Sequence, residues 1–404
     1  MNLIEKKIRN LNTKTNVTRD ELQQLAVQLS HEKKNIFFNW GTRLGKSKCI
    51  MEIVKSHNFK KVLFVCSQNI HIQNFKDDCQ KFGFDLSPYV FICWNSYHNY
   101  EGLVWDAIIQ DEVDHSINNH IAYLSKCTYS HVYFLTATIN QDQESKLRQI
   151  DYFKWSISSS QAMDWQILPL PTVYLKPIIM SPVQLKELQK MEERMERLKE
   201  ESLEKGWYKL VLLKGKKLED RIKKLEYELK LKWKEILKLY PDSDKENALT
   251  WEGLKVLKKG GERKKFFENI KMQWFEENGV FNRLKEKRTI FFLPDITDNK
   301  KLGNAVSSLE DSKTNTKILD NFNSGKIDYI ISKKILVRGV NVINVNWGYF
   351  GVIDLNGTSL TQSTARVLLG ISPYIFIPFV KGTKEEQVII KFLKSFKCTV
   401  EYLK

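Results

Sequence analysis

Residues 41–47 read Gly-Thr-Arg-Leu-Gly-Lys-Ser, a combination of residue types that suits the binding of nucleotide phosphates. In such a loop the lysine places a positive charge at the β- and γ-phosphates, the serine hydroxyl can bind Mg²⁺, and backbone N–H groups face the phosphate oxygens. The usual spacing is G-x-x-x-x-G-K-[ST], and by that count Trp40 stands where the first glycine belongs. Gly41 instead gives a loop one residue short, so the surrounding elements must decide whether this is a phosphate loop.

Two carboxylates form a second candidate group. Asp111 and Glu112 end the apolar stretch WDAIIQDE, residues 105–112. In a parallel sheet, the carboxyl end of this stretch lies at the same edge as the loop that follows residues 35–40. Asp111 would then hold Mg²⁺ through water, and Glu112 would orient and deprotonate an attacking water. The alternative is an acidic strand end without a catalytic role.

Short apolar runs alternate with amphipathic stretches in two parts of the chain, which is typical of βα units on a parallel sheet. The spacing of apolar residues predicts a helix over 47–57, so the candidate phosphate loop lies between a strand and a helix. A second helix is expected at 316–325, where a glycine closes it. The expected strands are 35–40, 61–67, 89–94, 105–112, 131–138, 288–294, 327–332, 347–355 and 374–380.

The stretch from 183 to 240 has helical periodicity and many charged residues. Two runs with apolar residues at spacings of three and four are separated near residues 206–215 and end at Pro241, which predicts a helical hairpin. Its lysines either grip nucleic acid or form the solvated face of an ordinary helix pair, and both alternatives stay open. These lysines are Lys214, Lys216, Lys217, Lys223, Lys224, Lys230, Lys232 and Lys234.

The chain of 404 residues is longer than one hydrophobic core usually supports. We predict an α/β chain with two parallel-sheet domains in tandem and the helical hairpin inserted between them. The predicted parts are a helical lead-in at 1–34, a nucleotide-binding domain at 35–180, a lysine-rich helical insertion at 181–262 and a second α/β domain at 263–404.

Composition narrows the class of protein. The net charge of +16 favours a polyanionic partner, for which nucleic acid is the usual candidate, although a lysine-rich background composition gives the same balance. The six cysteines never form C-x-x-C, so neither a zinc site nor a disulfide framework is expected, and His115 and His120 are five residues apart, so we do not expect them to bind a metal as a pair. We expect neither a signal peptide nor a membrane span, and we expect a reduced, cytoplasmic compartment of a bacterial or virus-infected cell.

With these residues in place, the first half of the chain resembles the superfamily 2 helicases and translocases, which are DExD/H-type ATPases with two RecA-like domains. Asp111-Glu112-Val113-Asp114 matches the DExD box, and His115 follows it as in several DExH relatives. Thr136-Ala137-Thr138 resembles the motif that couples the ATP site to nucleic acid. Other matches are 62–78 with Ser67, 93–100 with Ser96, and 18–28, which resembles the adenine-reading glutamine motif with Gln23 or Gln24 as the glutamine.

The second half resembles the helicase C-terminal domain more loosely. Residues 318–342 carry Phe322, Gly325, Ser332, Arg338 and Gly339 at the expected spacing, although Asn341 replaces the usual Asp. The final motif has a glutamine followed at +4 and +7 by arginines. Here Gln362 and Arg366 are present, but Leu369 stands at +7 and Ala365 replaces the customary glycine. One alternative is that Arg366, alone or with Arg338, stabilises the charge on the γ-phosphate. The others are that the motor is slow, or that a partner supplies the missing arginine.

The resemblance implies ATP and Mg²⁺ as cofactors and assigns roles residue by residue. It implies contacts to ATP from Gly41, Thr42, Arg43, Gly45, Lys46, Ser47, Gln23, Gln24, Arg338 and Gly339. It implies hydrolysis by Lys46, Asp111, Glu112, Gln362 and Arg366, with Ser47 and Asp111 on Mg²⁺. It implies coupling to nucleic acid through Thr136, Ala137, Thr138, Ser67, Ser96 and Ser332.

The leading hypothesis is an ATP-dependent nucleic-acid motor that moves along or remodels DNA, acting as a monomer on its track. Similarity to phage, Swi/Snf-like and branch-migration enzymes suggests branched replication or recombination intermediates as substrates. One alternative is an RNA helicase or RNA-dependent ATPase. Others are a weakly hydrolysing ATP-binding subunit of a replication or transcription assembly, and a restriction-type motor whose nuclease is another chain. The insertion at 181–262 is also a candidate surface for a protein partner.

Overall fold

The structure is a computed structural model that describes residues 3–115, 117–137, 139, 141–204, 248–294, 302–307, 311–332, 342–353, 358–368, 370 and 372–403. The chain divides into two units. One comprises Met1–Lys176 together with Val280–Lys404, and the other is Pro177–Gly279.

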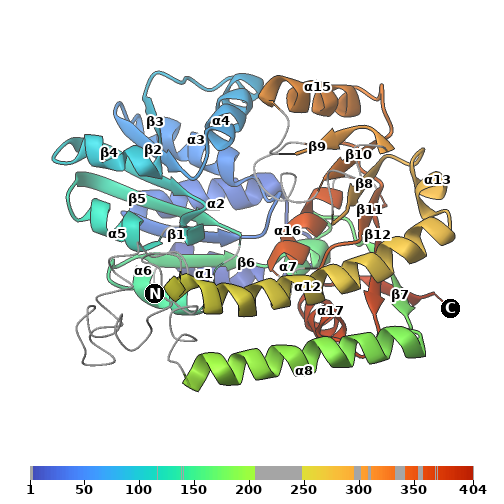
Figure 1. Ribbon diagram of the computed structural model, residues 1–404. Helices are drawn as coiled ribbons and strands as arrows, with labels where there is room; N and C mark the ends of the chain where they lie inside the picture. The colour runs from blue at the N-terminus through green and yellow to red at the C-terminus, as the bar shows by residue number, and fades with distance from the viewer. Residues whose placement is uncertain are drawn as a thin grey trace. The chain divides into compact units, whose positions relative to one another are not determined.

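Among the described residues, a six-stranded sheet with the strand order β3-β2-β4-β5-β1-β6 opens the first unit (Figure 1). Its strands are β1 (Asn35–Trp40), β2 (Val62–Cys66), β3 (Tyr89–Cys93), β4 (Val104–Asp111), β5 (Thr128–Thr136) and β6 (Phe153–Ile157). All of these pairs are parallel, so every strand delivers its last residue to the same edge. Since β5 lies between β1 and β4, Thr136 ends between the loop after Trp40 and the carboxylate of Asp111.

Alternation along the strands divides the core between the two faces of this sheet. Ile36 and Phe38 of β1 belong to a buried cluster with residues of α1 (Leu3–Leu11), α2 (Arg19–Glu32), α3 (Lys46–His57) and α4 (Asn69–Phe82). Phe37 belongs to a second cluster with residues of α5 (Ile117–Leu124) and α6 (Gln141–Leu147). Because successive side chains of a strand point to opposite faces, helices cover the sheet on both sides.

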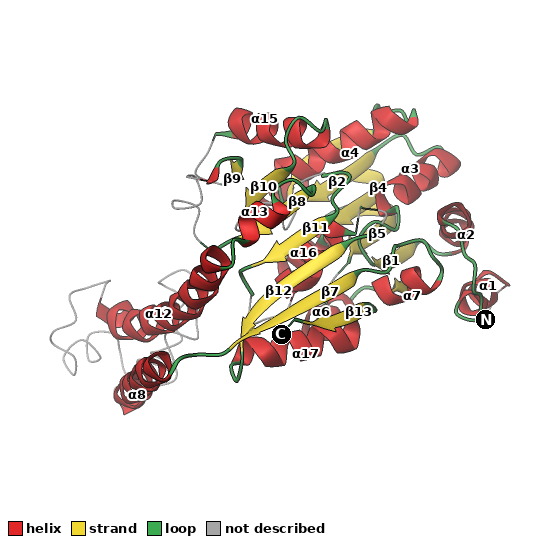
Figure 2. Cartoon of the chain, turned by 90° about the vertical axis from the view of Figure 1, so that its right-hand side faces the viewer, coloured by secondary structure: helices red, strands yellow, loops and turns green. Residues whose placement is uncertain are grey.

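A second sheet in the described residues has the strand order β13-β7-β12-β11-β8-β10-β9 (Figure 2). Its strands are β7 (Thr172–Ile178), β8 (Thr289–Phe292), β9 (Ala305–Val306), β10 (Tyr329–Ser332), β11 (Trp347–Phe350), β12 (Tyr374–Val380) and β13 (Thr399–Tyr402). Parallel pairing joins β8 to both β10 and β11, β9 to β10, β11 to β12, and β7 to β13. Its helices are α13 (Val280–Leu284), α15 (Ser312–Asn323), α16 (Thr358–Val367) and α17 (Lys384–Ser395).

Contacts between α7 (Ser159–Asp164) and the end of α17 join the two sheets of the first unit. The Ser160 hydroxyl donates to the carbonyl oxygen of Ser395 at 3.3 Å and accepts the backbone N–H of Lys397 at 3.2 Å. Lys397 also forms an ion pair with Asp164. One buried hydrophobic cluster contains residues of both sheets, which agrees with these contacts.

The predicted strands from 35 to 138 and from 288 to 380 are confirmed, as are the helices predicted over 47–57 and 316–325. Strand β7 is a difference: its residues fall within the predicted first domain, yet it lies in the second sheet. The physical reason is that its partners β12 and β13 come near the end of the chain, so nothing local signals the pairing. The division at residues 34, 180 and 262 stays a prediction.

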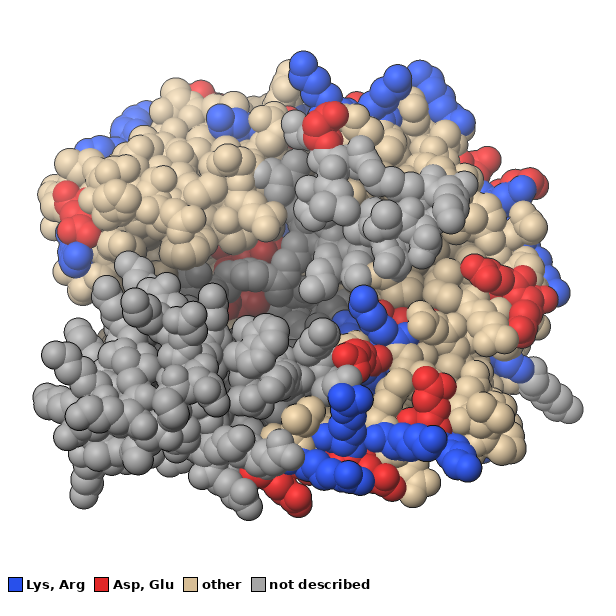
Figure 3. All heavy atoms as spheres, in the orientation of Figure 1, with Lys and Arg blue, Asp and Glu red and all other residues tan. Residues whose placement is uncertain are grey.

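The second unit contains two long helices, α8 (Pro182–Glu204) and α12 (Ala248–Glu277), which lie side by side in Figures 1 and 2. Arg263 on α12 pairs with Glu192 on α8, Nη2 to Oε1, at 2.6 Å. Helix α8 carries seven acidic and five basic side chains, and the two signs are interspersed over it in Figure 3. The predicted helix over 218–236 and the lysines from Lys214 to Lys234 lie outside the described residues.

Membrane-spanning helices were also sought in the described part of the chain. None of its helices is both long and apolar enough to cross a bilayer.

Candidate functional site

The loop Gly41–Gly45 connects the carboxyl end of β1 to the first turn of α3. The N–H of Gly41 donates to the carbonyl oxygen of Ile157 on β6 at 2.8 Å, which fixes the start of the loop. Gly45 directly precedes α3 with φ of 84°, in the left-handed region that favours glycine. A Cβ on Gly45 would stand 2.7 Å from the side-chain amide nitrogen of Gln23, so the loop packs directly against α2.

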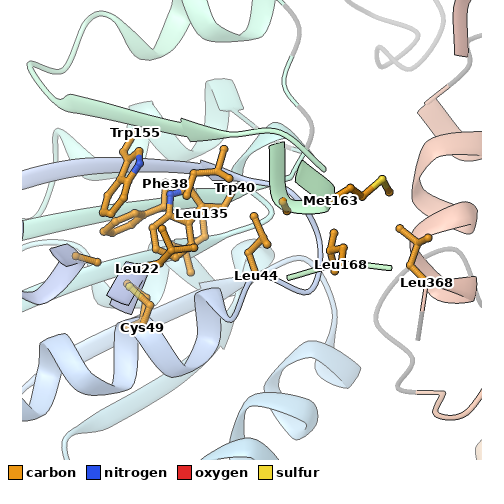
Figure 4. Close-up of a cluster of buried hydrophobic side chains, with 14 of the residues drawn as sticks. Leu22, Phe38, Trp40, Leu44, Cys49, Leu135, Trp155, Met163, Leu168 and Leu368 are labelled. Atoms are coloured by element: carbon orange, nitrogen blue, oxygen red, sulfur yellow. The ribbon is translucent and has the colours of Figure 1, made fainter. Parts of the chain in front are cut away.

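Buried aromatic rings form the floor of this loop (Figure 4). The ring of Trp40, the last residue of β1, meets Trp155 at a centroid distance of 4.9 Å and Phe38 at 5.2 Å, both edge to face. Leu44, inside the loop, is fully buried. Such packing holds the backbone of the loop rigidly, which a phosphate cradle requires because its N–H groups must be aimed before the anion arrives.

Lys46 opens α3, and its charge lies in a buried, acidic environment. Its ammonium group donates to the carbonyl oxygens of Trp40 at 2.8 Å and Gly41 at 3.3 Å. Burial lowers the pKa of Lys46 to about 8, while the negative charges of Asp111 and Glu112 oppose that shift. The lysine predicted from the loop and the carboxylates predicted from β4 therefore share one site.

Arg43 adds a second buried cation to the loop. Its backbone is left-handed, with φ of 69°, and the guanidinium of Arg19 donates to its carbonyl oxygen at 3.3 Å. The pKa of Arg43 is lowered to about 10, first by burial and then by the charge of Arg366, while the charge of Asp78 on α4 opposes the shift. The loop thus concentrates positive charge that a polyanionic ligand would stabilise.

Asp111 and Glu112 occupy the turn at the end of β4. Asp111 Oδ1 accepts the backbone N–H of Glu112 at 3.1 Å. Burial raises the pKa of Asp111, and the charge of Lys46 opposes that shift. Glu112 has φ of 50°, an unusual left-handed conformation for a residue with a side chain, and such backbone strain is often found at functional sites.

The end of β5 contacts this turn. The hydroxyl of Thr136 donates to Oδ1 of Asp114 at 2.8 Å, and the side-chain amide of Gln143 donates to the carbonyl oxygen of Asp114 at the same distance. Thr136 is buried, with 1% of its surface exposed. The residue predicted to couple the ATP site to nucleic acid therefore contacts the acidic turn directly.

Arg366 reaches the site from α16 of the second sheet. Burial lowers the pKa of its guanidinium, and the negative charge of Glu112 opposes that shift. Glu112 and Arg366 therefore interact electrostatically across the two sheets of the first unit. Gln362 lies on the same helix, one turn before Arg366.

Three residues of the site were not identified from the sequence. His71 on α4 faces Glu112, Arg19 supports the loop, and Asp78 balances Arg43. Each is distant in the sequence from the motif it contacts and belongs to an amphipathic helical stretch. They lie within the stretches 18–28 and 62–78 that resemble helicase motifs, but only the packing of α2 and α4 shows which residues of those stretches reach the site.

The remaining predicted residues are more scattered. Gln23 is buried against Gly45, whereas Gln24 is exposed. Ser67 follows β2 and Ser96 follows β3, both half-buried at the carboxyl edge, and Ser332 ends β10 with 1% of its surface exposed. Thr42 and Ser47 are half-buried beside Lys46, and Ala137 follows Thr136. Thr138, Arg338, Gly339 and Leu369 lie outside the described residues.

The residues present fit a nucleotide with Mg²⁺. The left-handed Gly45 and the buried Lys46 suit a triphosphate, and Ser47 and Asp111 are the oxygen ligands that would hold the metal ion. No cluster of three His, Cys, Asp or Glu side chains suited to a metal occurs in the part of the chain that the structure describes. Mg²⁺ needs none, because it binds through one or two protein oxygens, phosphates and water.

Neither a protein-family model nor a curated protein sequence matches the chain. Solved structures do match. The helicase domain of Hef from Pyrococcus furiosus is 15% identical, over 92% of this chain and 97% of that one, with a TM-score of 0.54. S. cerevisiae Dbp5, solved with RNA and ADP BeF3, is 9% identical, over 95% of this chain and 89% of that one, with a TM-score of 0.57.

At these identities the likeness establishes the fold. The two parallel sheets are two RecA-like domains in tandem, as in the helicase structures they match. The predicted fold class is thereby confirmed.

Proposed function

We propose that this chain is an ATP-dependent nucleic-acid motor that couples ATP hydrolysis to movement along DNA or to its remodelling. One observation carries the proposal. Lys46 and the carboxylates of Asp111 and Glu112 share a half-buried site in the first domain, and the half-buried Arg366 of the second domain interacts with Glu112. ATP bound at this site would contact both domains, so its hydrolysis would change how the domains hold each other.

Each residue has a defined task in this proposal. Lys46 binds the β- and γ-phosphates, and Ser47 and Asp111 would hold a Mg²⁺ ion, which would supply charge shielding for the phosphates. Glu112 accepts the proton of the attacking water. Arg366, with Gln362 one turn away, stabilises the charge that develops on the γ-phosphate. Gln23, which packs against Gly45, would read the adenine.

The net charge and the two matched structures bear on whether the nucleic acid is DNA or RNA. The net charge of +16 supports a nucleic-acid partner, because Lys and Arg gain affinity by releasing the counterions of phosphates. Among the matched structures, Dbp5 was solved bound to RNA, so an RNA-dependent ATPase is the second candidate function. We favour DNA, with branched replication or recombination intermediates as the substrates.

Steady-state ATP hydrolysis tests the proposal. The protein is assayed with single-stranded, forked and duplex DNA and with RNAs of matched sequence. Lys46→Ala should lower the stimulated rate on the order of a hundredfold, because the phosphate charge loses its partner. Lys48→Ala is the matched control, since Lys48 lies on the same helix and forms an exposed ion pair with Asp20.

The outcomes separate the alternatives. Stimulation by DNA that is lost in Lys46→Ala and kept in Lys48→Ala supports a DNA motor. Stimulation by RNA alone identifies an RNA-dependent ATPase. Salt-sensitive binding without hydrolysis on any nucleic acid contradicts the motor and favours the ATP-binding subunit. In that case Leu369→Arg tests whether the missing arginine is the cause.

A further inference from the structure

His71 connects α4 to the proposed general base. Its Nδ1 lies 3.7 Å from Oε1 of Glu112, and the two side chains are 6% and 28% exposed. A hydrogen bond of this kind measures about 2.7–3.2 Å, so the two side chains are near each other but not hydrogen-bonded through these two atoms. A small rotation of either side chain, or a small shift of α4, is enough to close this contact.

The surroundings of Glu112 make this contact consequential. Its backbone is fixed by the hydrogen bond to Asp111 and by the left-handed φ of 50°, so its side-chain rotation is the remaining freedom. Charged groups of both domains act on its carboxylate, His71 and Lys46 from the first domain and Arg366 from the second. When Arg366 turns to the γ-phosphate, His71 is close enough to close onto the carboxylate and orient it.

The position of His71 ties this contact to the surface where nucleic acid is expected. The backbone N–H of His71 donates to the backbone carbonyl oxygen of Gln68 at 3.0 Å. Gln68 lies in the exposed turn that follows Ser67. The thiol of Cys93, at the end of β3, donates to the side-chain oxygen of Asn69 at 3.1 Å. The first turn of α4 is therefore bonded to the turn after β2 and to the last residue of β3, and the predicted nucleic-acid contacts lie in the turn after β2 and in the loop that follows β3.

We propose that His71 is a positioning residue that orients Glu112 when nucleic acid binds at the Gln68–Asn69 turn. A strand pressed against this turn shifts the start of α4, the imidazole closes onto the carboxylate, and Glu112 is aimed at the attacking water. The inference deepens the proposed function and rests on it. It accounts for track-dependent hydrolysis with a contact inside the first domain.

Substitutions of His71 test this role in the full-length protein, with the nucleic acid that stimulates hydrolysis best. In His71→Ala, kcat at saturating nucleic acid should fall on the order of tenfold, because the base loses its orientation. The KM for ATP and the Kd for the oligonucleotide should change by less than about twofold. His71→Asn should restore much of the rate, since its amide nitrogen occupies nearly the place of Nδ1, whereas His71→Gln should not.

Gln73→Ala serves as the control, because Gln73 lies on the exposed side of the same helix. Thermal melting of each variant separates misfolding from loss of orientation. Wild-type stimulation in His71→Ala, or equal rates in the Asn and Gln variants, would overturn the role of His71. A wild-type protein that no nucleic acid stimulates would instead refute the proposed function.

Discussion

The hydroxyl of Thr136 donates a hydrogen bond of 2.8 Å to Oδ1 of Asp114, and this bond links the end of β5 to the turn after β4. The bond therefore joins β5, the strand between β1 and β4, to the turn that carries the carboxylates. Under the proposed function, a change in the acidic turn on hydrolysis would be transmitted through this bond to the end of β5.

Thr136→Val removes this hydroxyl while keeping the shape of the side chain. We expect it to lower the free energy of unfolding by about 1–2 kcal/mol, because the carboxylate of Asp114 loses a donor. ATP hydrolysis should persist, but strand displacement per ATP should fall. Thr136→Ser, which keeps the hydroxyl, is the control. Equal displacement per ATP in the Val and Ser variants would contradict the coupling role.

The pKa of Lys46, about 8, predicts how ATP affinity depends on pH. Below pH 8 the ammonium is charged and binds phosphate. Above pH 8 the free protein loses this proton, so binding must take up a proton and the Kd should rise roughly tenfold per pH unit. Titration calorimetry between pH 7 and 9.5 measures both the Kd and the proton uptake. Lys46→Arg, which stays charged, should remove the dependence, and a flat profile in the wild type would contradict it.

Two left-handed glycines give a matched pair of substitutions. Gly45 has φ of +84° beside Gln23, whereas Gly83, which ends α4, has φ of +70° and nothing within 4 Å of an added Cβ. Alanine at either position should cost about 1–2 kcal/mol of stability from backbone strain. Only Gly45→Ala should weaken ATP binding, because its methyl group displaces Gln23 and crowds the cradle. Chemical denaturation and nucleotide titration measure the two effects separately.

Arg288 is a structural cation of the second domain. Its guanidinium donates to the carbonyl oxygens of Asn344, Phe322, Ile327 and Ile343 at 3.2, 2.6, 3.0 and 3.1 Å. It also lies over the ring of Phe322, 3.9 Å from the centroid. Arg288→Lys should cost about 3 kcal/mol, because one ammonium cannot satisfy these carbonyls. The exposed Arg283→Lys is the control, and equal denaturation midpoints would refute this assignment.

Three histidines, His31, His57 and His131, cluster at the end of α3. This cluster should make the protein sensitive to acid. The ring of His57 lies between those of His31, at 4.1 Å, and Phe59, at 4.6 Å. Burial and then the charges of His31 and His131 lower the pKa of His57 to about 4. The neutral form is therefore favoured by folding, and this stability is lost as pH falls from about 6.5 towards 4.

Because His57 is partly exposed, we expect a loss of only about 1 kcal/mol between pH 7 and 5. Urea denaturation across this range measures it. In His57→Phe, which keeps the stacking but cannot ionise, the decline should be shallower. A slope that matches the wild type would assign the acid sensitivity to other groups.

The sequence predicts this fold where the signal is local and fails where it is not. Strands β1 to β5 follow from compact apolar runs, and the phosphate loop follows from its place after β1. Strand β13 is short and exposed throughout, so no apolar run marks it. Helix α12 contains Gly253, Gly260 and Gly261, residues that disfavour helices, and its second half lies outside the predicted insertion.

The candidate site shows the same limit. Lys46, Asp111 and Glu112 follow from motifs, and Arg366 follows from a resemblance, because each lies at a fixed spacing from other recognisable residues. His71, Arg19 and Asp78 have no such spacing, since the packing of helices against the sheet edge decides where they point. Gln23 and Gln24 were equal candidates in sequence, and only the burial of one face of α2 distinguishes them.

The parallel pairing of β7 with β13 has a consequence for the order in which the chain folds. Residues 172–175 cannot pair with β12 until residue 380 is made, nor with β13 until residues 399–402 have left the ribosome, whereas β1 to β6 are complete by residue 157. The first domain can therefore fold during synthesis, while β7 stays open through the production of the insertion and the second domain. Closing so long a loop is entropically costly, so the second domain is the one expected to depend on chaperones and to misfold when synthesis is interrupted.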